Sequence, residues 1–180
     1  VPLDMRDTDF VVPAGKAVRL PSMYRRPPDG RWEPSQPPPA FLSDVYFSGA
    51  TGLISTARDY ARFEQMLLNG GQLDGVRILA PRTVELMRTN HVGDLFHGMR
   101  GNEDGMGFGL GVAITLDETR AGWRRSAGSA GWYGAFGTMA WHDPREGIVA
   151  VLATQQSSAA LQNDFGNAVM QAITVSRPEK

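Results

Sequence analysis

The stretch GSAGWYGAFGT (128–138) places four glycines and three aromatic rings in eleven residues. Gly131 and Gly134 lack a Cβ, so a ligand or a neighbouring backbone can come within contact distance of this segment. Trp132 and Tyr133 would supply rigid walls beside such a ligand. The main-chain N–H directly after Gly134, that of Ala135, would then donate to a carbonyl that becomes an oxyanion. The alternative is a glycine-rich strand entry with aromatic packing, which residue types alone favour.

A second candidate is the sequence Ala127-Gly128-Ser129-Ala130-Gly131, which is one residue away from the nucleophile elbow G-x-S-x-G. The elbow needs an apolar strand before the serine and a helix after it. Here the polar segment GWRRS precedes the serine and a strand pattern follows it. We therefore expect Ser129 to be a turn residue.

Metal and phosphate sites have weak support. His91 and His97 lie six residues apart with Asp94 between them, His142 is remote, and neither HExxH nor a cysteine pattern occurs. The glycine-rich run GMGFGLG (105–111) is not followed by GK[ST] or by a helix start, so it does not predict a phosphate cradle. No metal and no cofactor is predicted.

Composition narrows the class of protein further. The chain has 180 residues, 42% of them hydrophobic and 21% charged, which is typical of a soluble globular domain. A formal net charge of -1 gives no field that would attract nucleic acid or an anionic membrane. No run approaches the roughly 18 apolar residues of a membrane span. The opening VPLDMRDTDF lacks the features of a signal peptide, so we expect a processed chain or a piece of a longer one.

Residues 1–56 are expected to be rich in loops. The segment 27–40 holds six prolines, so it predicts an extended surface connection and excludes regular helix or central strand. Trp32 in this segment is a candidate to dock on the body of the protein. A flexible interdomain linker is the competing interpretation.

Residues 57–90 are expected to form a helical region. Thr56 and Asp59 have the spacing of a capping box, and Tyr60, Phe63 and Leu67 then share one helical face. The helix should end at 69–71, where Asn-Gly-Gly occurs. A small hairpin turning at Asp74-Gly75 and a second helix starting at Pro81 and closing near Asn90 complete this region.

Antiparallel strands are expected over 105–155, after an irregular loop at 91–105. The run 105–116 alternates glycine with apolar residues and predicts a strand that another backbone approaches closely. A hairpin follows, turning at 143–147, and its second strand IVAVLAT is apolar throughout, which predicts burial on both faces. A terminal helix over 158–175 carries one apolar stripe: Leu161, Phe165, Val169 and Ile173. The predicted class is α+β within a single domain, 1–180.

Four ordered blocks resemble the serine hydrolases of the class C β-lactamase and family VIII carboxylesterase group. PLDMRDTDF (2–10) is similar to that family's P-L-G-M-x-D-T-x-F. The block 48–91 is similar to its G-L-x-S-T-x-x-D-Y-x-R-F helix, small hairpin and L-x-P-x-T-V-x-x-M helix. GMGFGLGVAI (105–114) and GWYGAFGTMAWHDPREGIVAVLATQ (131–155) are similar to G-x-G-F-G-L-G-F and to the esterase-like G-W-G-G-A-A-G-T-x-x-W-x-D-P.

This resemblance implies a role for the aromatic motif. The family's cleft-lining strand carries Lys-Thr-Gly in β-lactamases and His-x-Gly or Trp-Gly-Gly in esterase-like members, and Trp132-Tyr133-Gly134 stands at that position. The resemblance thus makes these three residues substrate-binding and the N–H of Ala135 one of two oxyanion-hole donors. No Lys or Thr is available here to hold a β-lactam carboxylate, so a small acyl ester is the better expected substrate. Tyr133 in the middle place would narrow the cleft.

The resemblance also implies that the nucleophile lies elsewhere. The family uses a Ser-x-x-Lys helix and a Tyr-x-Asn or Tyr-x-Ser segment. The two lysines of this chain, Lys16 and Lys180, follow Pro13 and Arg177 at that spacing, so Ser-x-x-Lys is absent. Tyr46-Phe47-Ser48 fits Tyr-x-Ser by letter, but it follows the first block instead of preceding it, so Tyr46 is interpreted as packing or loop.

The expected fold is therefore the C-terminal part of a β-lactamase-like domain, incomplete without its N-terminal half. The expected function is part of a serine hydrolase that cleaves ester, or amide or β-lactam, bonds through an acyl-enzyme. The partner would be an N-terminal segment that carries the nucleophile, and the chain alone would be inactive and not independently stable. The alternative is a non-catalytic truncated or degenerate module that acts in binding or assembly.

Overall fold

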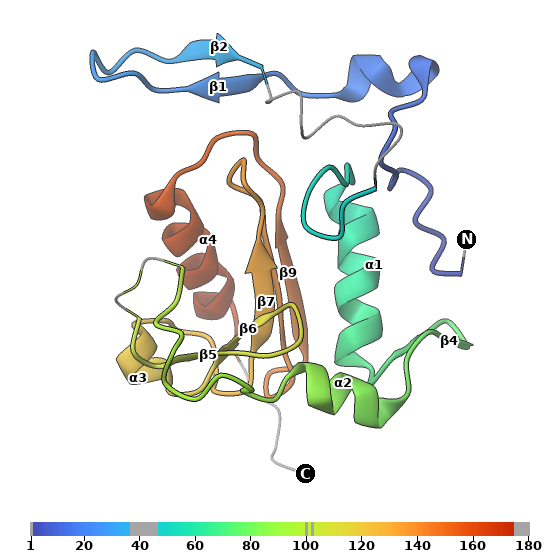
Figure 1. The fold of residues 1–180 in the computed structure, drawn as a ribbon, viewed down its shortest axis with the longest axis vertical. Coiled ribbons are helices and arrows are strands. Elements are labelled where there is room, and N and C mark those ends of the chain that lie inside the picture. The colour runs from blue at the N-terminus through green and yellow to red at the C-terminus, as the bar shows by residue number, and fades with distance from the viewer. Residues whose placement is uncertain (1, 37–46, 100, 102, 175–180) are drawn as a thin grey trace.

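The computed structural model describes residues 2–36, 47–99, 101 and 103–174, and its centre is a five-stranded antiparallel sheet. The strands follow one another in the order β5-β6-β7-β8-β9, so each connection joins neighbours. Helix α1 (Ala57–Leu68) covers one face and helix α4 (Ala159–Gln171) covers the other (Figure 1). The predicted α+β class with antiparallel strands is confirmed.

Strand β8 lies at the centre of the packing, not β9. Every residue of β8 is buried, whereas β9 is half-buried except at Ala150. The prediction that the apolar strand IVAVLAT is buried on both faces is wrong, because β9 is the edge strand of the sheet within the described residues. The five strands are β5 (Met106–Phe108), β6 (Ala113–Thr115), β7 (Ala130–Tyr133), β8 (Met139–Asp143) and β9 (Ile148–Leu152).

The run 105–116 forms two strands and not the single strand predicted. The N–H of Gly109 donates to the Val112 carbonyl at 2.8 Å, and Gly111 has φ +81°, so the chain reverses there. The expected close approach of another backbone is confirmed, because a Cβ on Gly109 would overlap the carbonyl oxygen of Met87. Glycine alternation suits both a strand and this short hairpin, which explains the error.

The helical region agrees closely with the prediction. Thr56 is the N-cap of α1, its Oγ1 accepting from the N–H of Asp59 at 3.2 Å, and the helix ends at Leu68 with Asn69 as C-cap. Strands β3 (Gln72–Leu73) and β4 (Val76–Arg77) form the small hairpin, and α2 (Pro81–Met87) starts with Pro81 in its first turn.

The turn of that small hairpin and the loop after α2 also follow the expectation. Asp74 and Gly75 have φ values of +49° and +79°, the left-handed pair that a tight two-residue turn needs. No helix or strand occurs among the described residues between α2 and β5. A short helix, α3 (Glu118–Ala121) with Asp117 as N-cap, had no prediction.

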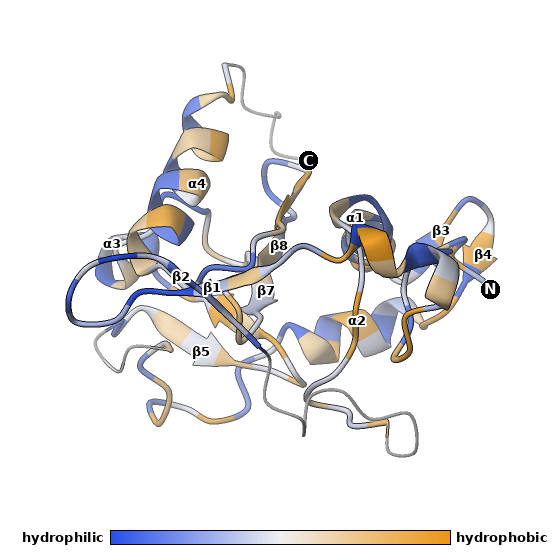
Figure 2. Ribbon diagram, turned by 90° about the horizontal axis from the view of Figure 1, so that it is seen from above, coloured by the Kyte–Doolittle hydropathy of each residue, from blue (hydrophilic) through white to orange (hydrophobic). Residues whose placement is uncertain are grey.

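Three apolar clusters occur among the described residues. Under α4, Met139 and Trp141 of β8 pack with Phe165 and Val169, so half of the predicted α4 stripe faces the sheet. Leu161 is 38% exposed and Ile173 lies beyond the end of the helix. A second cluster joins the N-terminal segment, α1 and α2 through Leu3, Met66, Leu67 and Val84. The third joins Met106 and Ala113 of the sheet with Ala121 and Trp123. Figure 2 shows the apolar residues of the helices and central strands.

The region before α1 contains a 3-10 helix (Ala14–Arg19) and a projecting hairpin, β1 (Met23–Arg25) with β2 (Glu33–Ser35). This hairpin is hydrophilic and extends from the body of the protein (Figures 1 and 2). Part of the proline-rich segment forms its turn and second strand, and residues 37–40 lie outside the described residues. Trp32 is 45% exposed beneath the Arg26 guanidinium, so it does not dock on the body.

Among the described residues, no helix combines the length and the apolar character that a membrane crossing requires.

Candidate functional site

The aromatic motif ends strand β7 and enters a tight turn. The N–H of Gly134 donates to the Thr138 carbonyl at 2.8 Å, and the N–H of Gly137 donates to the Gly134 carbonyl at 3.1 Å. Ala135 therefore occupies the second position of this turn and is exposed. Its N–H has no hydrogen-bond acceptor within the described part of the chain. An unpaired main-chain donor thus projects from the end of β7.

Trp132 belongs to an aromatic cluster that joins three segments. Its ring centroid lies 5.2 Å from that of Phe108 on β5, in an edge-to-face arrangement, and 6.4 Å from that of Phe96 in the 91–105 loop. The rings of Phe96 and Phe108 are 5.2 Å apart. This cluster fixes the loop against the end of the sheet at the position of the predicted substrate-binding motif.

Tyr133 follows Trp132 on the strand, and the two ring centroids lie 6.2 Å apart in an edge-to-face arrangement. It pairs with Met139 of β8 and packs against the core beneath α4. The structure therefore brings the rings of Trp132 and Tyr133 together and places Gly134 in the turn. Both rings pack against one apolar cluster, and Tyr133 also contacts the core beneath α4.

The two glycines of the motif are required by neighbouring protein groups. A Cβ on Gly131 would overlap the carbonyl oxygen of Ala140 and crowd Trp141, its partner on β8. A Cβ on Gly134 would overlap the hydroxyl of Thr138. For Gly131, the close neighbour is thus strand β8. The sequence left open whether a ligand or a neighbouring backbone approaches this segment.

Ser129 is not a nucleophile elbow, as expected. Its side chain is 1% exposed, and its hydroxyl donates to the Ser126 carbonyl at 2.6 Å. The Ser129 N–H donates to the same carbonyl at 3.0 Å and closes a turn. The hydroxyl is therefore unavailable to a substrate.

The histidines do not gather into a metal site. His97 Nδ1 lies 3.1 Å from Asp104 Oδ1, and His91 Nε2 lies 2.8 Å from the Leu86 carbonyl. Among the described residues, no group of three or more His, Cys, Asp or Glu side chains could hold a metal ion.

His142 forms a buried pair that the sequence did not reveal. Its Nδ1 lies 2.7 Å from Oε2 of Glu64 on α1, and both side chains are almost fully buried. The pair joins α1 to β8 beneath the face that α1 covers. The available signal in the sequence was an acidic residue on the apolar face of an amphipathic helix, because Glu64 lies one turn after Tyr60 on the same face.

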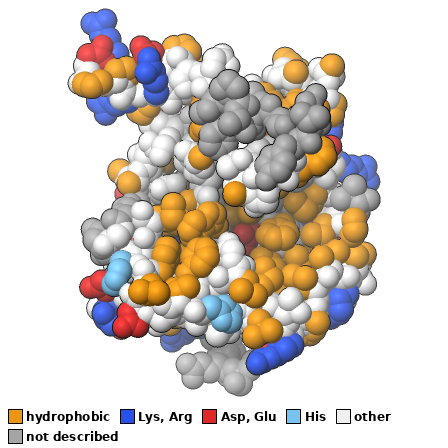
Figure 3. Space-filling view, viewed as in Figure 1, with side chains coloured by type: hydrophobic (Ala, Val, Ile, Leu, Met, Phe, Trp, Pro, Cys, Tyr) orange, Lys and Arg blue, Asp and Glu red, His pale blue; other side chains and the backbone are white. Residues whose placement is uncertain are grey.

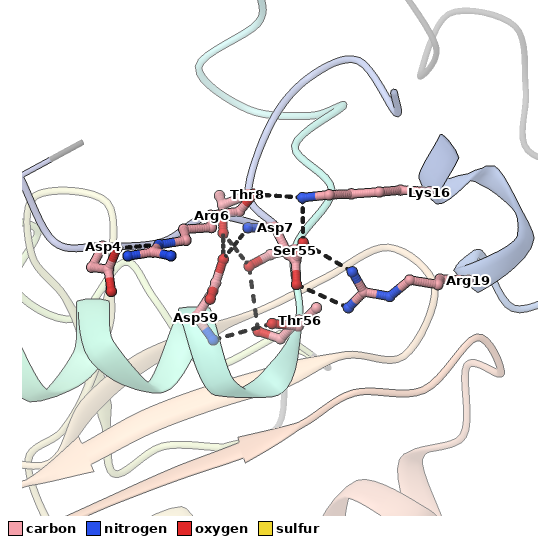
Figure 4. Close-up of polar contacts among 9 residues, drawn as sticks. All are labelled: Asp4, Arg6, Asp7, Thr8, Lys16, Arg19, Ser55, Thr56 and Asp59. Atoms are coloured by element: carbon pink, nitrogen blue, oxygen red, sulfur yellow. Dashed lines mark hydrogen bonds and ion pairs between the residues drawn. The ribbon is translucent and has the colours of Figure 1, made fainter. Parts of the chain in front are cut away.

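A second polar cluster ties the N-terminal segment to the start of α1 (Figure 4). The buried Asp59 carboxylate accepts from the Asp7 N–H at 2.7 Å and from the Thr8 hydroxyl at 3.0 Å. The carboxylate of Asp7 accepts two hydrogen bonds from Arg19, each 2.9 Å, and one from Lys16. These donors hold the pKa of Asp7 well below its usual range, Arg19 having the largest effect.

Two pockets among the described residues have linings that do not include the motif at 132–135. One of about 120 Å³ lies beside the Asp7 cluster, and one of about 330 Å³ lies between the 90–97 loop, β5 and α3. The face of the molecule drawn in Figure 3 has a hollow, with apolar side chains gathered on both sides of it and an acidic side chain within it.

The β-lactamase family model matches residues 1–172. Two Mycobacterium tuberculosis proteins, Rv1367c of strain H37Rv and MT1414 of strain CDC 1551, are each 35% identical over 162 residues. That match covers 86% of this chain and 40% of each relative. The chain thus spans less than half the length of the curated relatives it matches.

Solved structures share the fold. EstCE1, described as a hydrolase with promiscuous acyltransferase activity, superposes with a TM-score of 0.76 at 24% identity, over 94% of this chain and 48% of its own. Unliganded simvastatin synthase (LovD) from Aspergillus terreus, in its selenomethionyl form, gives 0.78 at 22%, over 97% and 48%. The β-lactamase Mb2281c from Mycobacterium bovis gives 0.54 at 22%, over 69% and 46%.

Proposed function

This chain belongs to the β-lactamase family, and from that premise we propose that it forms one wall of the cleft of a serine hydrolase that cleaves esters through an acyl-enzyme. The single observation that carries the proposal is the N–H of Ala135 directly after the aromatic motif, because this residue is exposed and its N–H has no acceptor among the described residues. Preorganised main-chain donors of this kind stabilise the negative oxygen of a tetrahedral intermediate.

In this proposal, this chain supplies the oxyanion donor and another segment supplies the nucleophilic serine. A serine Oγ attacks the ester carbonyl, the proton passes to the lysine of a Ser-x-x-Lys helix, and the carbonyl oxygen becomes an oxyanion that Ala135 stabilises. Collapse breaks the ester C–O bond, and the lysine returns the proton to the departing alkoxide, which leaves as the alcohol. Water then attacks the acyl-enzyme, the acid is released, and the serine hydroxyl is restored. Since Ser-x-x-Lys does not occur in 1–180, the serine and lysine lie on an N-terminal segment. The assembled enzyme, as used below, is this chain together with that segment.

Several features support a docking partner for this chain. Strand β9 is an edge of the sheet in the described residues, and unpaired edges and apolar faces are normally covered in native proteins. Apolar side chains flank the hollow in Figure 3. The curated relatives are more than twice as long as the matched region, which leaves room for such a segment. Large exposed apolar side chains include Leu53, Val76, Ile78, Leu86, Leu110 and Leu116.

Esters are the favoured substrate class. The motif Trp132-Tyr133-Gly134 has no Lys or Thr for a β-lactam carboxylate, and the Trp132 cluster offers an apolar surface next to Ala135. The description of EstCE1 as a hydrolase with acyltransferase activity is consistent with acyl chemistry on this fold.

A fluorophosphonate probe tests the proposal on the assembled enzyme. We expect one serine outside residues 1–180 to be labelled, with ester hydrolysis lost in parallel, as peptide mass spectrometry would show. Labelling of Ser129 would contradict the proposal. Absence of both labelling and ester turnover would favour a non-catalytic module that acts in binding or assembly.

A further inference from the structure

The turn that carries Ala135 is joined to the first part of helix α4. The side-chain amide of Gln162 donates to the Gly137 carbonyl at 3.2 Å, across 25 positions of the chain. Figure 1 shows the start of α4 and the connection between β7 and β8 at the same end of the sheet. Gly137 is buried, and a buried carbonyl needs a donor in place of water. Gln162 supplies such a donor from outside the turn.

The hydrogen bonds inside the turn set its shape but not its place on the protein. The N–H of Gly134 donates to the Thr138 carbonyl at 2.8 Å, and the N–H of Gly137 donates to the Gly134 carbonyl at 3.1 Å. Both bonds join residues of the same hairpin, so a tilt of the whole turn about the end of β7 would break neither of them. The bond from Gln162 resists such a tilt, because it ties the turn to a different element.

The helix that holds Gln162 is itself fixed on the sheet. Its N-terminus is capped by the Ser158 hydroxyl. Phe165 lies three residues after Gln162, hence on the same side of the helix, and packs with Met139 and Trp141 of β8. The amide of Gln162 therefore extends from a rigid base.

The loop before α4 supports the turn at the same residue. Gly137 has φ +96°, and a Cβ on it would overlap the carbonyl oxygen of Gln156. The backbone of the turn thus rests directly on the backbone of this loop. The contact limits movement of the turn toward the loop, and the Gln162 bond limits movement away from α4. Together they fix Gly137, which is two residues from Ala135.

We propose that Gln162 is a positioning residue, whose amide holds the Ala135 N–H at the place where the oxyanion forms. Gln162 acts through the turn and does not contact substrate. This inference rests on the proposed function, because the donor has a catalytic meaning only if an oxyanion forms beside it.

The first test is Gln162→Met in the assembled enzyme, since methionine keeps the length and helix propensity of glutamine but has no N–H to donate. We expect kcat for a nitrophenyl ester to fall about 3–10-fold, the effect of losing one hydrogen bond of ordinary strength. KM should stay unchanged, because the oxyanion exists only beyond the ground state. The matched control is Gln171→Met, at the exposed last position of α4, which should keep the parent kcat.

A double-mutant cycle tests whether Gln162 acts through the Ala135 N–H. In an Ala135→Pro background the donor is absent, so Gln162→Met should lower kcat no further. Equal losses from Gln162→Met in both backgrounds would overturn the inference. A raised KM with unchanged kcat in the single variant would also overturn it, since Gln162 would then contact substrate.

Hydrogen exchange separates this inference from the proposed function. The Gly137 amide, which closes the turn, should exchange about 3–10-fold faster in Gln162→Met and at the parent rate in Gln171→Met, as NMR would show. If the parent enzyme hydrolyses no ester, the proposed function fails, and the exchange rates still decide whether Gln162 anchors the turn. Either an unchanged kcat beside an active parent or an unchanged Gly137 exchange rate in folded Gln162→Met would overturn the inference. If Gln162→Met does not fold, Gln162→Ala, with the highest helix propensity, replaces it in every arm.

Discussion

His142 Nδ1 lies 2.7 Å from Oε2 of Glu64, although the two residues are 78 positions apart in the chain. His142 is fully buried and Glu64 is 3% exposed, so this contact between β8 and α1 is screened from water. Each side chain offers the other a hydrogen bond in place of the water that burial removes. The pair therefore fixes where α1 sits on the sheet.

Removing one member of this pair should destabilise the fold strongly. Glu64→Leu leaves the His142 imidazole buried without its partner, and breaking a buried pair in this way costs about 3–5 kcal/mol. Urea unfolding of the assembled enzyme measures the loss. The matched control is Glu85→Leu, which removes an exposed pair with Arg82 and should cost about 0–1 kcal/mol. Equal effects of the two substitutions would contradict the role given to Glu64.

The Asp7 cluster should make stability depend on pH in the acid range. Because Arg19 and Lys16 depress the pKa of Asp7 from its ordinary value of 3.8, the folded state favours the ionised carboxylate. Its stabilisation is complete above the unfolded pKa and is lost as pH falls through the folded pKa. Asp7→Asn should therefore lower the melting temperature at pH 7, and the gap to the parent should narrow below about pH 3.8.

The control for this pH effect removes the donors instead of the acid. In a Lys16→Met/Arg19→Met background, Asp7→Asn should produce little change in melting temperature at any pH. A gap between parent and Asp7→Asn that stays constant from pH 7 to pH 2 would show that the carboxylate charge is not what stabilises this cluster.

Local sequence signals predicted the helical region well. The Thr56 cap, the Asn69-Gly70 stop and the Asp74-Gly75 turn each depend on neighbours within a few residues, so their geometry is encoded in the segment itself. Ser129 was likewise assigned to a turn by its immediate context.

Contacts between segments far apart in the sequence could not be predicted from such local signals. Glu64 and His142 meet only after the sheet forms, and the burial of Arg125 depends on tryptophans from two different segments. The apolar run of β9 suits a central strand, but the strand order places it at an edge. The aromatic motif was found by its residues, whereas the packing of Trp132 against Phe96 and Phe108 needed coordinates.

Gly131 should tolerate no side chain. In Gly131→Ala the new Cβ would overlap the Ala140 carbonyl, and overpacking of this kind costs about 1–3 kcal/mol. Gly15→Ala is the control, since no atom lies within 4 Å of the position that its Cβ would take. Thermal unfolding should separate the two variants clearly. A melting temperature in Gly131→Ala equal to that of Gly15→Ala would contradict the close approach of β8.

Ester turnover should depend on the aromatic motif. Trp132→Ala removes the ring that packs on Phe96 and Phe108, which enlarges the site, and Gly134→Val forces a side chain against Thr138, which blocks it. Both changes should lower kcat/KM of the assembled enzyme for a small ester. Tyr24→Ala, on the projecting hairpin, is the control and should leave kcat/KM unchanged. Full activity in both motif variants would remove the site assignment.

The most direct measurement is the esterase rate of the assembled enzyme carrying Ala135→Pro. Proline lacks the N–H and suits the second position of a tight turn, so the donor is lost with little strain. We predict a fall in kcat of about 10²–10³-fold, as for other oxyanion-hole donors, while Ala135→Gly, which keeps the N–H, stays near the parent rate. A folded Ala135→Pro enzyme with the parent kcat would contradict the account.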